Sequence, residues 1–87
     1  MSSRHRRTLE EVFENPVRAN IVWKNVEAML EFYGATISER RGSVIAVELN
    51  QRVATFHRPH PQKEAKKYVI RDLRDFLMLA GLTPDEL

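Results

Sequence analysis

The stretch FHRPHP, residues 56–61, holds the side chains of this chain that are best suited to chemistry. His57 and His60 lie three positions apart in it, with Arg58 between them. Histidine suits proton transfer because its unperturbed pKa, about 6.5, lies near working pH, and the arginine fork binds a phosphate through two hydrogen bonds. A ribonuclease that uses no metal needs only such groups, since RNA carries its own nucleophile, the 2′-hydroxyl. The stretch also fits a plain strand end, where histidines are solvated and prolines shape the loop.

Other kinds of site find little support in the sequence. A metal would have only His57, His60 and Glu64 as close ligands, a weak pattern beside HExxH or a set of cysteines and histidines. The chain has no cysteine, which excludes disulfides, thiolate zinc sites and cysteine nucleophiles. Its three glycines are isolated, so it has no glycine-rich phosphate loop. We therefore expect no metal site and no cofactor.

A basic cluster follows the histidines. Lys63, Lys66 and Lys67 lie within the stretch KEAKK, and Arg71 comes four positions later. If this stretch opens a helix, its cations and the free backbone N–H groups of the helix start would together bind phosphate. The plainer interpretation is the solvated face of an amphipathic helix.

Length and composition predict a single small domain over residues 1–87. The chain is 43% hydrophobic and 30% charged, with a net charge of +2, which is typical of a soluble globular protein and compatible with nucleic-acid binding. No apolar run is long enough to span a membrane, so we expect a cytoplasmic protein without a membrane partner. We interpret residues 1–7 as a disordered basic tail and residues 21–84 as the folded core.

Two helices are predicted from apolar residues at spacings of three and four. The first runs from an N-cap at Asn20 to a stop at Gly34, and the second starts near residues 62–63 and ends before Gly81. A short extra helix in front of them is indicated by Thr8 and Glu11, which have the spacing of a capping box.

Between these helices the hydrophobic period changes to two, which predicts a three-stranded antiparallel sheet with two short connections. The strands lie in TISER, SVIAVEL and VATFHR, and the turns at Arg41-Gly42 and Asn50-Gln51. The order α-β-β-β-α predicts an α+β fold with both helices packed on one face of the sheet.

This order, with lysines opening the last helix, resembles the double-stranded-RNA-binding fold, which recognises phosphates and 2′-hydroxyls. A closer resemblance, over residues 21–84, is to the HicA family of bacterial toxins, which share that fold. It rests on the order and spacing of four pieces: MLEFYGA, RRGSV, FHRPHPQKEAKK and VIRDLRDFLMLAGLTP. The resemblance implies an mRNA interferase, an endoribonuclease that arrests growth and is neutralised by a HicB antitoxin.

One position departs from the family pattern. The family's catalytic histidine follows a Gly-Ser pair, and after Gly42-Ser43 this chain has Val44, which cannot move a proton. A turn centred on Asn50-Gln51 would place Val44 opposite His57, with Cβ atoms about 4.5–5.5 Å apart. Our hypothesis is that His57 replaces the missing histidine from the neighbouring strand. A one-residue shift in register would remove it from that face.

The resemblance and this register together suggest roles for the site residues. His57 is the predicted general base or acid, and His60 is a second candidate. Arg41 and Arg58 are predicted to hold the scissile phosphate, and the Gly42-Ser43 turn to bring backbone N–H groups near it. The predicted contacts to flanking phosphates come from Lys63, Lys66, Lys67 and Arg71.

Two alternatives remain beside the ribonuclease. The loss of the family histidine at Val44 favours an RNA-binding module without catalysis. A protein-interaction domain would use the open sheet face or the basic helix to bind only its partner.

Overall fold

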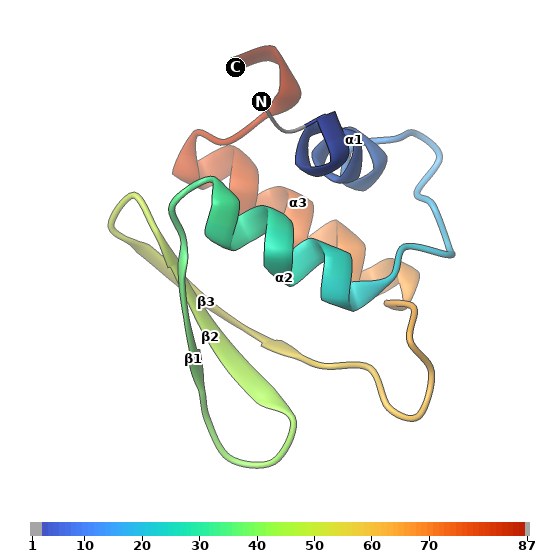
Figure 1. Ribbon diagram of the computed structural model, residues 1–87, viewed down its shortest axis with the longest axis vertical. Coiled ribbons are helices and arrows are strands. Elements are labelled where there is room, and N and C mark those ends of the chain that lie inside the picture. Colours follow the sequence, from blue (N-terminus) through green and yellow to red (C-terminus); the bar gives the residue numbers. More distant parts are fainter. Residues whose placement is uncertain (1–2, 87) are drawn as a thin grey trace.

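The computed structural model describes residues 3–86 and has the predicted α+β architecture. Three helices gather on one side of a three-stranded sheet (Figure 1). The first helix contacts the last turn of the described chain, where Arg6 donates a hydrogen bond to the Pro84 carbonyl. The elements in chain order are α1 (Ser3–Val12), α2 (Trp23–Phe32), β1 (Thr36–Glu39), β2 (Val44–Leu49), β3 (Arg52–His57), α3 (Lys67–Ala80) and the 3₁₀ turn η1 (Pro84–Glu86).

The sheet is antiparallel with the order β1-β2-β3, and the predicted pairing of its second hairpin is confirmed. Val44 pairs with His57, and Ile45 pairs with Phe56. The connection is the two-residue turn Asn50-Gln51, whose φ angles are 51° and 68°. Positive φ at both central positions is the geometry of a type I′ hairpin turn, whose twist matches that of the strands it joins.

One face of the sheet carries the core. Its apolar side chains pack against buried side chains of α2 and α3. Aromatic rings connect these layers: the ring centroid of Phe56 in β3 lies 6.0 Å from that of Phe76 in α3 and 6.1 Å from that of Trp23 in α2. The main core positions are Ile45, Val47, Leu49, Val26, Met29, Leu30, Leu73 and Leu77. Apart from Ala46 of the central strand, the buried strand residues lie on the side of the helices, so the expectation that α2 and α3 cover a single face is confirmed.

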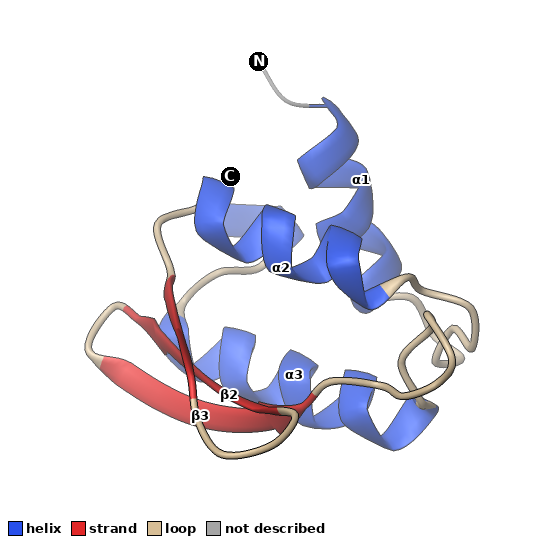
Figure 2. Cartoon of the chain, turned by 60° about the horizontal axis from the view of Figure 1, so that its bottom comes forward, coloured by secondary structure: helices blue, strands red, loops and turns tan. Residues whose placement is uncertain are grey.

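The opposite face has no helix over it, as the view in Figure 2 also shows. Apart from Val44 and Ala46 in the central strand its side chains are exposed: Thr36, Ser38, Glu48, Val53, Thr55 and His57. His57 therefore lies on the solvent face at the end of an edge strand.

The interpretation of residues 1–7 as a disordered tail is wrong for residues 3–7, which form the first part of α1; Met1 and Ser2 lie outside the described residues. Leu9 and Val12 are fully buried and anchor this helix against α2 and α3. Thr8 is not a cap but lies inside the helix, where its hydroxyl donates to the Arg4 carbonyl at 3.2 Å. The prediction failed because the anchoring apolar residues come only in the second half of α1.

Both long helices begin later than predicted. α2 is preceded by Val22 rather than capped by Asn20, whose side chain accepts a hydrogen bond from Arg18. α3 starts at Lys67, because the segment before it is extended: Ala65 N–H donates to the Ile21 carbonyl, and Trp23 N–H donates to the Lys63 carbonyl, both at 2.9 Å. Lys, Glu and Ala favour helix locally, but this long-range pairing prevails over propensity. No helix among residues 3–86 has the length and apolar character to cross a membrane.

The β2–β3 turn supplies a test of the fold. Gln51 has a φ of 68° without being a glycine, so Gln51→Gly should stabilise the protein by about 0.5–1 kcal/mol once the entropy of glycine is subtracted. Asn50→Gly is the matched control: it removes the hydrogen bond from Asn50 Nδ2 to the Ala80 carbonyl, 2.7 Å long, and should destabilise by about 1 kcal/mol. Urea unfolding of the three proteins measures both, and equal effects of the two substitutions would contradict this account.

Candidate functional site

The site is built around the end of β3, where His57 faces Val44 across the hairpin. The Arg58 N–H donates to the Ser43 carbonyl at 2.8 Å. In an antiparallel ladder, pairs that exchange backbone hydrogen bonds alternate with pairs that do not. Because Ser43 and Arg58 are hydrogen-bonded, the next pair, Val44 and His57, has no mutual backbone hydrogen bonds. In such pairs the Cα atoms are only about 4.5 Å apart and the side chains lie closest. The imidazole is thus next to the Val44 side chain on the outer face, as the hypothesis required.

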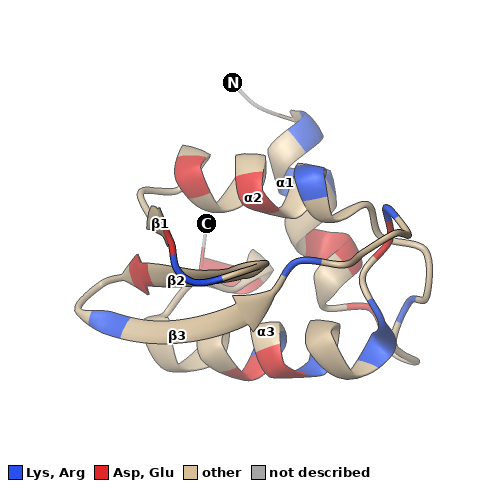
Figure 3. Cartoon of the chain, turned by 90° about the horizontal axis from the view of Figure 1, so that it is seen from below, with Lys and Arg blue, Asp and Glu red and all other residues tan. Residues whose placement is uncertain are grey.

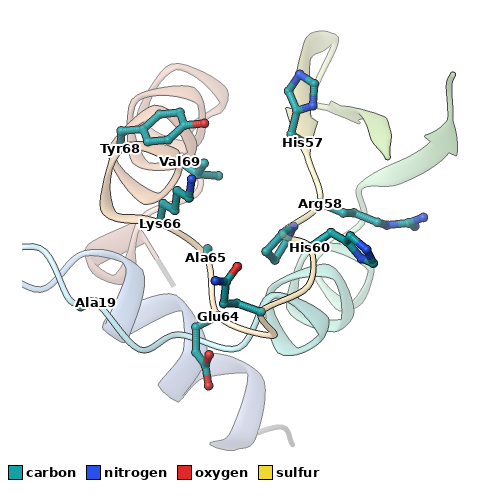
Figure 4. Close-up of a pocket in the computed structure, with 11 residues that line it drawn as sticks. Ala19, His57, Arg58, His60, Glu64, Ala65, Lys66, Tyr68 and Val69 are labelled. Atoms are coloured by element: carbon teal, nitrogen blue, oxygen red, sulfur yellow. The ribbon is translucent and has the colours of Figure 1, made fainter. Parts of the chain in front are cut away.

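A pocket of about 550 Å³ opens beside His57, between the end of β3 and the start of α3. Figure 4 shows Tyr68 and Lys66 on the α3 side and His57 on the opposite side, with Ala65 and Glu64 toward its base. The side chains of His57, Arg58, His60 and Lys66, which are cationic or can carry a proton, and the ring of Tyr68 thus line a space large enough for part of a nucleotide.

His60 does not join His57 across this space. It lines the same pocket from the loop that follows β3, and Figure 4 shows its ring directed away from His57, on the side of Arg58. The structure therefore places both predicted proton-transfer residues on the pocket wall, His57 at the end of β3 and His60 in the loop after it, but not face to face.

Arg58 is engaged in an ion-pair network. Its Nε donates to Glu27 Oε2 at 2.8 Å and its Nη2 to Glu27 Oε1 at 3.1 Å, which is a bidentate pair, and its Nη1 donates to Glu39 Oε2 at 3.2 Å. The hydrogen bonds to Glu27, and then those to Glu39, raise the pKa of Arg58 above its ordinary value. Because successive side chains of an extended strand point to opposite sides, Arg58 faces the helices while His57 faces solvent.

The same network attaches the loop after β3 to α2. Glu27 also accepts a hydrogen bond from Trp23 Nε1 at 2.7 Å, so one carboxylate joins the core tryptophan to the arginine that follows β3. Arg58 thus positions the end of β3. The contact to a scissile phosphate predicted for it stays a prediction, and in this structure two carboxylates occupy its guanidinium.

The β1–β2 turn lies at the same end of the sheet as His57. Arg41 and Ser43 are exposed, and Gly42 has a φ of 62° that a larger residue would adopt only at a cost. The Ser43 carbonyl is used by Arg58, and the Val44 N–H donates to the Arg41 carbonyl at 3.2 Å. The turn is therefore ordered, with its side chains free to meet a ligand.

The basic residues do not form a single helix face. Lys67 and Arg71 lie on α3 and Lys66 is its N-cap, whereas Lys63 belongs to the extended segment paired with α2. All four are exposed, and Figure 3 shows Lys and Arg on the loop before α3 and at its start. The first turn of α3 has no acidic residue and no side-chain cap, so its positive end is not neutralised locally.

Two residues of the site were missed by the sequence reasoning. Tyr68 is 56% exposed on the pocket wall, and the signal was an aromatic residue on the polar side of the helix, between Lys67 and Arg71. Glu27 had a weaker signal, its position four residues after Trp23 on the same helix face. Within residues 3–86 no group of three metal-binding side chains comes together.

Comparison with known families matches residues 23–82 to the family model described as HicA toxin of bacterial toxin-antitoxin. The match covers more than half of the chain and takes in α2, the whole sheet and α3, while α1 precedes it. Comparisons with curated proteins and with solved structures give no significant match.

The ion-pair network leads to a prediction for Arg58→Ala. A partly exposed bidentate pair contributes on the order of 1 kcal/mol, which for a domain of this size lowers Tm by roughly 4–8 °C. Arg58→Lys should restore little of it, because an ammonium cannot form the two-pronged contact. Thermal unfolding at low and high salt measures the effect, which should shrink as salt screens the pair. A Tm unchanged in Arg58→Ala would show that the network does not hold the loop.

Proposed function

The chain belongs to the HicA family and is the toxin of a bacterial toxin-antitoxin system; from this premise we propose that it is a metal-independent endoribonuclease acting on mRNA, neutralised by a HicB-like antitoxin. The observation that carries the proposal is the cross-strand pair of Val44 and His57. It supplies an imidazole next to the position at which the family pattern expects its histidine.

The proposed reaction uses groups of this chain and water. His57 takes the proton of a 2′-hydroxyl, the 2′-oxygen attacks the adjacent phosphorus, and the bond to the 5′-oxygen breaks to leave a 2′,3′-cyclic phosphate. The departing 5′-oxygen must gain a proton, and His60 is the candidate in the chain, with solvent water as the other source. Lys66 and the unneutralised start of α3 stabilise the negative charge on the phosphate oxygens.

RNA would reach this site along the basic surface. Lys67 and Arg71 are exposed on α3, the helix that contributes Tyr68 and Val69 to the pocket, and Lys63 is exposed in the segment before it. Such residues bind phosphates without reading sequence. The affinity should therefore fall steeply with rising salt, in proportion to the number of phosphates contacted. This behaviour separates RNA binding from an interface that binds only protein.

The central test is His57→Ala. Induction of the wild-type chain in a bacterial host should arrest growth and degrade mRNA, and His57→Ala should do neither, because proton transfer by such a group contributes about 10²–10⁴-fold to the rate. Growth curves and RNA integrity from the same cells measure both. His5→Ala is the matched control, since His5 lies on α1, stacked on Phe32 and outside the pocket.

A second variant tests whether the imidazole must be on β3 or can be on the paired residue of β2. Val44→His combined with His57→Ala moves the imidazole to the other member of the pair and should restore RNA cleavage in part. Arrest by His57→Ala alone would assign toxicity to another residue. RNA binding by the wild type without cleavage would instead favour the non-catalytic RNA-binding module.

The second prediction for this pocket is that the Tyr68 ring stacks on an RNA base. This exposed ring, opposite His57, is suited to stack on a base that has left the RNA helix, which is worth about 1–3 kcal/mol. Tyr68→Ala should weaken binding of single-stranded RNA about tenfold or more, while Tyr68→Phe, which keeps the ring, should bind as the wild type does. Fluorescence anisotropy with a labelled oligonucleotide gives both affinities. A loss in Tyr68→Phe equal to that in Tyr68→Ala would assign the role to the hydroxyl.

A further inference from the structure

The outer edge of β3 presents a row of backbone groups that have no hydrogen-bond partner among residues 3–86. β3 is an edge strand of six residues, Arg52–His57, and its register with β2 runs without a bulge. The Arg58 N–H donates to the Ser43 carbonyl, so the even-numbered residues of β3 direct their N–H and C=O groups toward β2. The N–H and C=O groups of Val53, Thr55 and His57 therefore point away from the sheet.

These groups find no other backbone partner within residues 3–86, where the backbone hydrogen bonds outside the ladders include none from Val53, Thr55 or His57. All three residues are exposed, Val53 at 61%. Edge strands are usually protected by a bulge, a proline or a covering loop, and β3 has none of these before Pro59. The edge is thus open for pairing over its full length.

A stripe of α3 lies beside this edge. Phe76 packs on Phe56 of β3, and Leu79 follows one turn later on the solvent side, 65% exposed. Tyr68 lies two turns before Phe76 and lines the pocket with His57. Together with the exposed side of α3 that carries Tyr68 and Leu79, the edge formed by Val53, Thr55 and His57 makes a surface, here called the β3 edge surface. Lys66 lies at its pocket end and Leu79 at its other end, and the exposed carboxylates of Asp72 and Asp75 lie between Tyr68 and Leu79 on the same face of the helix.

We propose that the antitoxin binds by adding an extended strand to the edge of β3. Extended segments recognise open sheet edges through main-chain hydrogen bonds, with alternate side chains entering flanking pockets. The family membership implies an antitoxin partner, and the β3 edge surface ends at the pocket that His57 and Lys66 line. A strand placed there would cover that pocket, so a single contact would both bind the toxin and exclude its substrate.

The β3 edge surface also bears on the chemistry of the added strand. The side chains of such a strand alternate between the two faces of the sheet, so an apolar one fits beside Val53 on the outer face and another beside Leu79 on the helix side. An acidic side chain fits toward Lys66 at the pocket. The proposal rests on the antitoxin part of the proposed function and not on RNA cleavage, so it stands or falls separately from the ribonuclease.

The alternating ladder makes a sharp test by amide hydrogen exchange. In the free toxin the N–H groups of Val53, Thr55 and His57 should exchange fast, and those of Ala54 and Phe56 slowly. In the complex with the co-expressed product of the gene beside its own, the first set should slow by tenfold or more while the second set changes little. NMR-detected exchange resolves individual amides. Unchanged exchange of the first set in the complex would overturn the proposal.

Thr55→Pro removes one outward N–H without touching the β2–β3 ladder, and it should weaken antitoxin binding by tenfold or more. Thr55→Ala, which keeps the N–H, is the matched control and should bind within about twofold of the wild type. Calorimetric titration compares them, and equal binding of the two variants would contradict the proposal. Should Thr55→Pro fail to fold, the exchange pattern of the wild type decides. Concentration-dependent protection in the free toxin would assign the edge to a second copy and overturn the proposal.

Discussion

The register of the β2–β3 hairpin is the constraint on which the candidate site depends. Side chains of a strand alternate between two faces, so a slip of one residue would bring His57 to the core side and Phe56 to solvent. The two-residue turn at Asn50-Gln51 prevents that slip, although it requires positive φ at two residues that are not glycine. Burial of Ile45 and Phe56 on the helix side supports the same register. The turn and the core thus agree, and the outer face receives His57 as a consequence.

Alternation also separates two neighbours that the sequence brings together. His57 and Arg58 are adjacent, yet an extended backbone directs them to opposite sides of the sheet. Arg58 consequently meets Glu27 of α2 and Glu39 of β1, which offer a bidentate and a single contact. The arginine acts on the site through the position of the strand end. The segment before α3 is anchored in a similar way, by its backbone pairing with Ile21 and Trp23.

The sequence was sufficient for the features that local patterns control. Period-two alternation predicted the strands and their pairing, and the glycine after Ala80 marked the end of α3, where Gly81 has a φ of 81°. It was insufficient wherever a distant contact prevails. The pairing of Lys63–Ala65 with the start of α2 delays α3, and Leu9 and Val12 hold α1 in a helix whose first half looks like a solvated tail. The pocket beside Tyr68 likewise exists only because the chain folds the start of α3 back toward β3.

Under the proposed function, the pair formed by Val44 and His57 makes the functional position a place in the fold rather than a place in the sequence. Directly opposed residues without mutual backbone hydrogen bonds hold their side chains closer together than neighbours along a strand do. An imidazole on either strand therefore reaches nearly the same volume of space, beside the same pocket and the same helix start. Exchange of a histidine across such a pair alters the strand that carries the group and leaves the surrounding charges unchanged. The edge strand that carries His57 differs from the central strand in one respect, because its backbone is open to a partner. Placing the histidine on β3 would thus couple the chemistry of the site directly to whatever pairs with that edge.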